Sequence, residues 1–112
     1  QPDILYIGGL SRALRVSDMT NQASLLCSPH NATFGMLQVF SIHMNAAIPN
    51  PHPFLEFSID QDVLDPFTKD FFIPQVEVDD GKVRVPEDPG WGISINNDWL
   101  EGSVYTLSEI NS

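Results

Sequence analysis

Apolar residues gather in three short runs in the first half of the chain, at residues 4–7, 25–28 and 54–57. Each run is bounded by glycine, proline or polar residues. Runs of this length with turn-forming neighbours are typical of buried β-strands. The pattern therefore predicts three strands.

Two longer segments between these runs have helical spacing of apolar residues. Ser11 can cap a helix over about residues 12–23, and a second helix is predicted over about residues 36–47. Pro49 and the prolines that follow it end the second helix. The order strand–helix–strand–helix–strand predicts parallel strands joined by right-handed crossovers.

Three ionisable residues lie beside the predicted strands: Asp3, His30 and Glu56. His30 follows Ser28-Pro29 at the end of the second run, and α/β barrels carry their chemistry at the carboxyl ends of strands. We expect the three side chains to converge at one end of a parallel sheet, with Asp3 and His30 within hydrogen-bonding distance.

The second half of the chain has a different character. Residues 60–70 form an acidic loop, and two alternating stretches flank Asp80-Gly81, which is a hairpin signal. A proline- and glycine-rich cluster over residues 86–92 predicts a rigid turn. Residues 93–95 are expected to be extended, and Asn96 or Asn97 can cap a short helical turn near residues 98–101. The resulting division is residues 1–59 as part of a (β/α) barrel, and residues 60–112 as loop, hairpin and tail.

The length, charge and cysteine content of the chain argue against several classes of function. The 112 residues suit one domain, and the formal charge of −10 argues against binding to nucleic acid or to an anionic membrane. No apolar run is long enough to span a membrane and no signal peptide is visible. Cys27 is the only cysteine, so nothing indicates secretion, and we expect a cytoplasmic protein. The sequon Asn31-Ala32-Thr33 is therefore interpreted as incidental.

Several sequence motifs occur in an informative order. Gln-Pro-Asp with Ile-Gly-Gly comes first, then Ser-Pro-His, then Ala-Ala-Ile-Pro before Phe-Leu-Glu-Phe, and finally Val-Pro-Glu-Asp-Pro-Gly-Trp-Gly-Ile after the Asp-Gly hairpin. In this order they resemble the enolase superfamily, in its mandelate racemase and muconate lactonizing enzyme-like branch. The resemblance covers the whole chain but only the C-terminal third or so of such an enzyme. It implies an α/β fold, the segment of a TIM-type barrel that holds about strands six to eight.

The resemblance also implies roles for individual residues. His30 would be the base that removes the proton next to a substrate carboxylate, and Asp3 would orient it and raise its basicity. Glu56 would hydrogen-bond the substrate carboxylate as charge develops there. Tyr6, where some relatives carry a lysine, and Ser28 would contact the substrate.

Such enzymes act on sugar acids and use Mg²⁺ to stabilise the enediolate. The family's metal ligands come from other strands, so we expect no metal ligand in this chain. Asp60, Asp62 and Asp65 are no substitute, because no glycine-bearing calcium loop follows. The function implied is that of a C-terminal portion of a Mg²⁺-dependent acid-sugar dehydratase or racemase.

A second hypothesis remains open: a non-catalytic, truncated or degenerate piece that folds only with a partner chain. The chain begins at Gln1 and Asp3 follows with no room for a preceding strand, so we expect a piece of a longer protein. Open sheet edges and apolar strand faces favour association, either as a homo-oligomer or with the missing barrel portion. We expect the chain alone to be catalytically silent.

Overall fold

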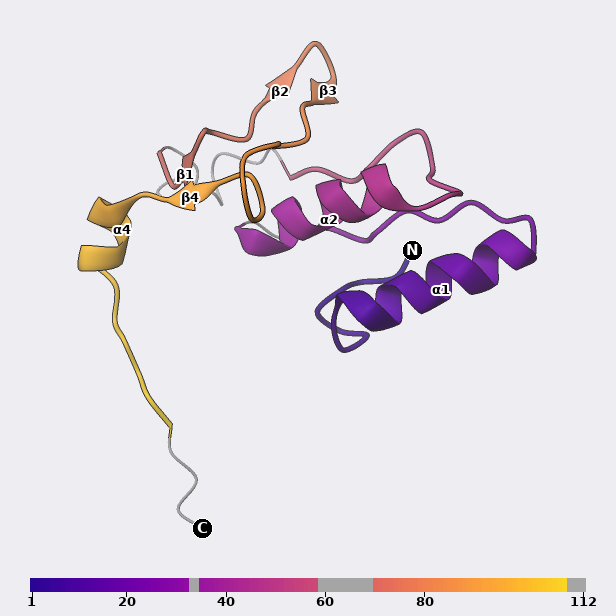
Figure 1. Ribbon diagram of the computed structural model, residues 1–112, viewed down its shortest axis with the longest axis horizontal. Helices are drawn as coiled ribbons and strands as arrows, with labels where there is room; N and C mark the ends of the chain where they lie inside the picture. Colours follow the sequence, from indigo (N-terminus) through magenta and orange to yellow (C-terminus); the bar gives the residue numbers. More distant parts are fainter. Residues whose placement is uncertain (33–34, 59–69, 109–112) are drawn as a thin grey trace.

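The computed structural model describes residues 1–32, 35–58 and 70–108. Its first half contains two helices, α1 (Leu10–Gln22) and α2 (Met36–Ala47), which contact each other. Short strands and the short helix α4 (Asn97–Glu101) follow, and an extended tail leads away from them (Figure 1). The described chain is thus a mixed α/β structure.

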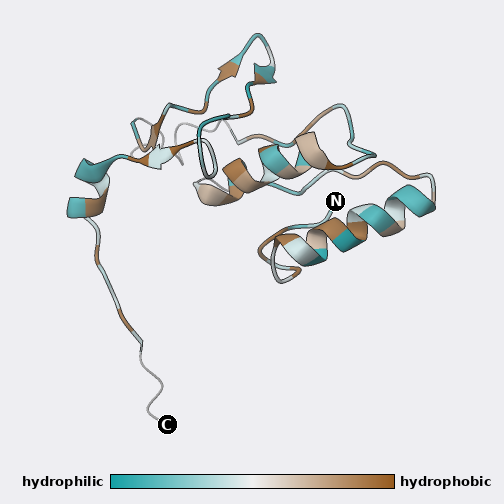
Figure 2. Ribbon diagram, viewed as in Figure 1, coloured by the Kyte–Doolittle hydropathy of each residue, from teal (hydrophilic) through white to brown (hydrophobic). Residues whose placement is uncertain are grey.

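The helix predicted over residues 36–47 is confirmed. It ends where Ile48 turns to an extended conformation one residue before Pro49, which cannot continue a helix. Buried side chains occur on most of its circumference, so α2 is a central element of the fold. Its apolar character is visible in Figure 2.

Helix α1 begins earlier than predicted, and the capping role expected of Ser11 is wrong. The helix starts at Leu10, and Gly9 occupies the N-cap position with φ of 101°. No side chain caps this end. Glycine adopts such a φ without steric cost, so the backbone enters the helix directly from the Gly8-Gly9 turn.

The strand predicted at residues 4–7 is also wrong, because these residues form consecutive turns. The cause is the side chain of Asp3. Its Oδ1 accepts hydrogen bonds from the backbone N–H of Leu5 at 2.8 Å and of Tyr6 at 3.0 Å, and its carbonyl accepts from Ile7 at 2.9 Å. A short acidic side chain that satisfies nearby N–H groups favours a turn over an extended strand.

The three continuous parallel strands that the sequence predicts do not form, and the described residues pair in parallel beside these segments only as isolated bridges. Asp3 pairs with His30 and Cys27 pairs with Pro51, both in parallel. Neither residues 25–28 nor residues 54–57 form a continuous strand. Proline has no N–H for a ladder, and the N–H of Phe54 donates instead to His52 Nδ1 at 3.1 Å.

The hydrophobic core lies between the N-terminal turns, α1 and α2. Its buried members are Ile4, Ala13, Cys27, Leu37, Met44 and Ile48, with Ile7, Leu10 and Phe40 packed against them. Cys27 is buried with them, as expected of a small apolar residue.

The buried side chain and backbone of Asn50 form hydrogen bonds to α1 and to residues 25–27 beside this core. Its Oδ1 accepts from Ser17 Oγ at 2.8 Å, and its Nδ2 donates to the Leu25 carbonyl at 2.8 Å and to Thr20 Oγ1 at 2.9 Å. Its backbone carbonyl accepts from Cys27 N–H at 2.8 Å. Asn50 is buried, so these bonds replace water and connect α1 to both neighbouring segments.

The predicted hairpin around Asp80-Gly81 is confirmed. Strand β2 (Val78–Asp79) pairs antiparallel with β3 (Lys82–Val83). Asp80 and Gly81 have φ of 46° and 71°, the left-handed values that a two-residue type I′ turn requires.

The remaining C-terminal elements also follow the sequence pattern. The extended piece expected at residues 93–95 contains β4 (Ser94–Ile95), which pairs antiparallel with β1 (Phe72–Ile73). Asn96 caps α4, its side chain accepting from Asp98 N–H at 3.1 Å. The acidic loop at residues 60–70 lies outside the described residues except for Asp70. Within the described ranges, no helix is long and apolar enough to cross a membrane.

Replacing Asn50 by alanine should destabilise the protein by about 2–3 kcal/mol, because the buried Ser17 hydroxyl would lose its partner and the bonds to Thr20 and Leu25 would be lost. The free energy of unfolding, measured by urea denaturation, tests this. Asn21→Ala on the exposed side of α1 is the matched control and should change stability by less than about 0.5 kcal/mol. Equal effects of the two substitutions would contradict the assigned role of Asn50.

Candidate active site

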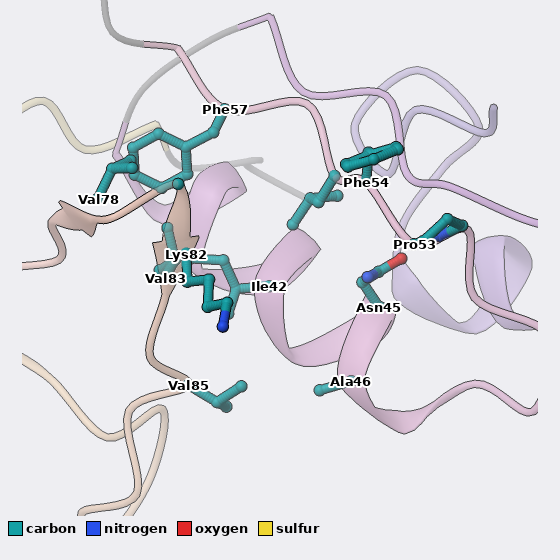
Figure 3. Close-up of a pocket in the computed structure, with 12 residues that line it drawn as sticks. Ile42, Asn45, Ala46, Pro53, Phe54, Phe57, Val78, Lys82, Val83 and Val85 are labelled. Carbon is teal, nitrogen blue, oxygen red and sulfur yellow. The ribbon is translucent and has the colours of Figure 1, made fainter.

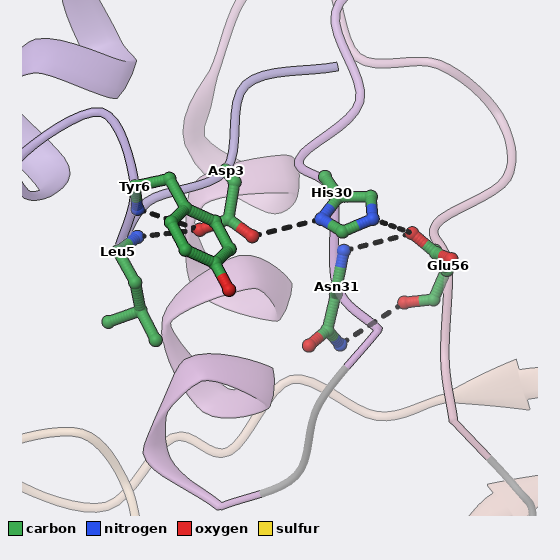
Figure 4. Close-up of polar contacts among 6 residues, drawn as sticks. All are labelled: Asp3, Leu5, Tyr6, His30, Asn31 and Glu56. Atoms are coloured by element: carbon green, nitrogen blue, oxygen red, sulfur yellow. Dashed lines mark hydrogen bonds and ion pairs between the residues drawn. The ribbon is translucent and has the colours of Figure 1, made fainter.

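Asp3 and His30 form a hydrogen-bonded pair at the start of the fold. His30 Nδ1 lies 2.9 Å from Asp3 Oδ2, so the expected hydrogen bond is present (Figure 4). The backbone supports the pair, because His30 N–H donates to the Pro2 carbonyl at 3.0 Å within the parallel bridge.

Asp3 is held as a carboxylate. Burial raises the pKa of its carboxyl, but the hydrogen bonds from His30 and from the N–H groups of Tyr6 and Leu5 outweigh this, and the pKa lies below its ordinary value. An ionised carboxylate only accepts hydrogen bonds, so the proton of this contact belongs to His30 Nδ1. In neutral His30 the lone pair is then on Nε2, which faces away from Asp3 and can accept a proton.

Glu56 lies on the opposite side of the imidazole ring. Its Oε2 is 3.8 Å from His30 Nε2, and its side chain is 46% exposed (Figure 4). The ring is therefore placed between two carboxyl groups that come from segments far apart in the sequence. A substrate next to Nε2 would meet both the imidazole and Glu56.

The cavity beside Glu56 has a volume of about 320 Å³. Ser28 and Glu56 line it together with Gln1, Leu26, His52, Phe54 and Leu55. Asp3 and His30 are not among the lining residues. Glu56 thus connects this cavity to the Asp3–His30 pair.

The other two predicted site residues are placed differently. Ser28 is buried, and its Oγ donates to the Phe54 carbonyl at 3.2 Å. Tyr6 is 90% exposed and contacts Asp3 through its backbone N–H. Their substrate contacts remain predictions.

Asn31 was missed as a site residue, since the sequence suggested only a sequon. It is fully buried, and it contacts both the carboxyl group and the backbone carbonyl of Glu56. The signal in the sequence that could have identified Asn31 is its position directly after His30.

The described residues do not provide a binding site for a divalent metal. Among them, no group of three or more His, Cys, Asp or Glu side chains is close enough to hold an ion. Both carboxylate oxygens of Asp3 already accept hydrogen bonds, so this carboxylate is committed to His30 and the turn. Asp60, Asp62 and Asp65 lie outside the described residues.

A further cavity of about 500 Å³ lies between α2, residues 53–57 and the β2–β3 hairpin (Figure 3). Its lining is mainly apolar, and Lys82 and Asn45 are its polar members together with backbone. This cavity is separate from the candidate active site, because Asp3, His30 and Glu56 do not line it.

Comparison with known proteins identifies the relatives of this chain. A family model described as enolase C-terminal domain-like matches residues 1–99. Arabinonate dehydratase of Saccharolobus solfataricus is 26% identical over 101 residues, which cover 90% of this chain and 26% of that protein. D-gluconate dehydratase of Thermoproteus tenax is 28% identical over 111 residues, covering 98% and 22%. The chain thus spans about a quarter of the length of the curated relatives it matches.

Solved structures give the same result. A protein of Roseobacter denitrificans proposed to be a racemase has a TM-score of 0.84 and 43% identity, covering 98% of this chain and 30% of that one. An enolase of the mandelate racemase subgroup from Agrobacterium tumefaciens has a TM-score of 0.68 and 26% identity, covering 84% and 25%.

The Asp3–His30 pair predicts a measurable titration. The pKa of the Asp3 carboxyl should lie below the ordinary value of about 3.9 and should rise in His30→Ala, because the imidazole donor is lost. Carboxyl-carbon NMR titration measures it. Since the folded-state pKa is lowered, the stabilisation from ionised Asp3 is present above about pH 4 and is lost as the pH falls through that pKa.

His43→Ala is the control for this titration, since His43 contacts the Trp91 carbonyl at 3.0 Å rather than Asp3. It should leave the Asp3 titration unchanged. An Asp3 pKa that does not respond to His30→Ala would contradict the assigned hydrogen bond.

Proposed function

The chain belongs to the enolase C-terminal domain-like family, and from this premise we propose that it carries the acid–base residues of an enzyme that removes the proton next to the carboxylate of a sugar acid. The chain is a mixed α/β part of the barrel domain of that superfamily. The observation that carries the proposal is the 2.9 Å contact between Asp3 Oδ2 and His30 Nδ1.

His30 is proposed as the base. Its Nε2 takes the α-proton, and the imidazolium that forms is stabilised by ionised Asp3 on the other ring nitrogen. Return of the proton from Nε2 to the same face of the carbon regenerates the substrate and gives exchange in D₂O, whereas racemisation needs a second acid, from another part of the protein, that protonates the opposite face. Alternatively, the proton on Nε2 can be given to a departing β-hydroxyl, which completes dehydration with release of water.

Glu56 is proposed to act on the substrate carboxylate. That carboxylate gains negative charge as the α-proton leaves, so a hydrogen bond from a protonated Glu56 becomes stronger in the transition state. Its position 3.8 Å from His30 Nε2 supports a substrate lying against both residues. Tyr6 and Ser28 are proposed to contact the rest of the substrate.

Superfamily members generally use Mg²⁺, and we propose the same for the complete enzyme. Among the described residues no group of three or more His, Cys, Asp or Glu side chains could hold such an ion, and its ligands are proposed to come from other parts of the protein. The steps proposed for His30, Asp3 and Glu56 therefore use only these side chains.

A sugar acid is proposed as the substrate class because two curated relatives are arabinonate and D-gluconate dehydratases. A relative proposed to be a racemase keeps racemisation as the alternative reaction. Both reactions begin with the same proton transfer, so the site geometry supports either.

In the protein that carries this sequence, His30→Asn should lower the rate of α-proton exchange with solvent deuterium by about 10²–10⁴-fold, because the base is removed. NMR of aldonic acids in D₂O measures exchange, and the appearance of a 2-keto-3-deoxy product reports dehydration. His43→Gln should retain the wild-type rate. Unchanged exchange in His30→Asn would exclude His30 as the base.

We also propose that the first half of the chain is covered by further protein, either the remaining barrel or a second chain. Large apolar side chains are exposed there: Leu5, Tyr6, Leu25, Leu26 and Phe54, the last at 77%. In this proposal residues 1–59 form the barrel part, and residues 60–112 form the loop, hairpin and tail. A non-catalytic piece that folds with a partner would expose the same surface.

Residues 1–112 expressed alone should associate, because apolar area of this extent favours burial. They should show no proton exchange, because the metal ligands proposed to stabilise the enediolate would come from other parts of the protein. Light scattering after size-exclusion chromatography measures the mass. The double variant Leu26→Ser, Phe54→Ser should reduce association, whereas Val104→Ser in the exposed tail should not. A stable monomer with proton-exchange activity would contradict this proposal.

A further inference from the structure

Asn31 connects the segment that carries His30 to the segment that carries Glu56. It follows His30 directly in the chain, and its backbone N–H donates to Glu56 Oε2 at 2.9 Å (Figure 4). Its Nδ2 donates to the Glu56 backbone carbonyl at 3.2 Å. We propose that Asn31 is a positioning residue that fixes the Glu56 carboxyl group relative to the His30 imidazole, an inference that rests on the proposed function of these two residues.

Asn31 and Glu56 differ sharply in burial. Asn31 is 0% exposed, whereas almost half of the Glu56 side chain is exposed. A glutamate with that much exposure has several accessible rotamers. A buried neighbour that holds both its carboxyl group and its backbone restricts this freedom. Because Asn31 is itself inaccessible, it acts through Glu56 rather than by touching substrate.

The Asn31 amide replaces backbone pairing at this point of the fold. The parallel bridges are at Cys27–Pro51 and Asp3–His30, and residues 54–57 form no strand. The Nδ2 bond to the Glu56 carbonyl therefore ties the two segments together beyond the last bridge between them. Without it, the Glu56 backbone would lose its direct hydrogen bond to the residue that follows His30, and the Ser28 Oγ bond to the Phe54 carbonyl would hold the segments two residues earlier.

The other half of the Asn31 amide is not satisfied. Its Oδ1 is buried and has no hydrogen-bond partner among the described residues. A buried, unpaired acceptor lowers stability, so this asparagine is not the residue that stability alone would favour. The asparagine side chain supplies the Nδ2 donor for the hydrogen bond to the Glu56 backbone carbonyl.

The backbone N–H of Asn31 also selects between the two Glu56 oxygens. Oε2 accepts this N–H, which favours Oε1 as the site of the proton when Glu56 is protonated. Under the proposed function, Oε1 is then the oxygen that donates to the substrate carboxylate. The positioning role therefore includes the orientation of the carboxyl group.

Two substitutions test the inference in the intact, cofactor-loaded protein. Asn31→Ala keeps the backbone N–H and removes Nδ2, and should lower kcat for proton exchange by about 10–100-fold with a smaller change in KM. Asn31→Asp keeps the side-chain shape but turns an acceptor toward the Glu56 carbonyl, and should lower kcat at least as much. Asn45→Ala is the matched control, because Asn45 lies on α2 and its buried Oδ1 likewise has no hydrogen-bond partner among the described residues. It should retain wild-type kcat.

A double-mutant cycle separates positioning from general structural damage. If Asn31 acts through Glu56, Asn31→Ala should change kcat by less than about threefold in a Glu56→Gln background. The same loss of kcat in both backgrounds would overturn the inference.

A crystal structure of Asn31→Ala or Asn31→Asp gives a readout that does not depend on activity. The Glu56 carboxyl group should leave its wild-type place, 3.8 Å from His30 Nε2. A wild-type protein without proton exchange would refute the proposed function, but the carboxyl position would still decide the role of Asn31. An undisplaced Glu56 in either variant would refute that role.

Discussion

The parallel alignment of Cys27 with Pro51 is the constraint on which the site depends. Cys27 N–H donates to the Asn50 carbonyl at 2.8 Å, and its own carbonyl accepts from His52 N–H at 2.9 Å. The buried Asn50 side chain holds α1 and the Leu25 carbonyl in the same unit. A shift of one residue would leave these buried groups unpaired, so the alignment is strongly favoured. It places His30 and Glu56 at the same end.

The Asp3 carboxylate holds a backbone turn and an imidazole ring at the same time. One oxygen closes the turn over residues 4–7, and the other accepts from His30 Nδ1. The turn therefore limits the rotation of the group that orients the histidine. Pre-organised pairs of this kind act without reorganisation when charge develops on the imidazole.

Local patterns in the sequence were sufficient for several elements. Helical spacing gave the extent of α2 and Pro49 its C-terminal end, because proline removes a backbone donor and clashes with the preceding turn. Asp80-Gly81 gave the hairpin through its left-handed turn, and Asn96 gave the start of α4. The order of the motifs gave the family, since that order is a property of the sequence itself.

The tertiary structure decided the rest, because it depends on contacts between distant residues. Residues 4–7 have the composition of a strand, yet the adjacent Asp3 carboxylate, which the distant His30 holds in place, accepts from Leu5 and Tyr6 N–H and favours a turn. Sequence order placed Asp3, His30 and Glu56 near one another, but only the fold set the distances between them. The contacts of Asn31 to Glu56 and of Asn50 to Ser17 could not be predicted, because an amide has no periodic signal and its partners are defined only when the chain has folded.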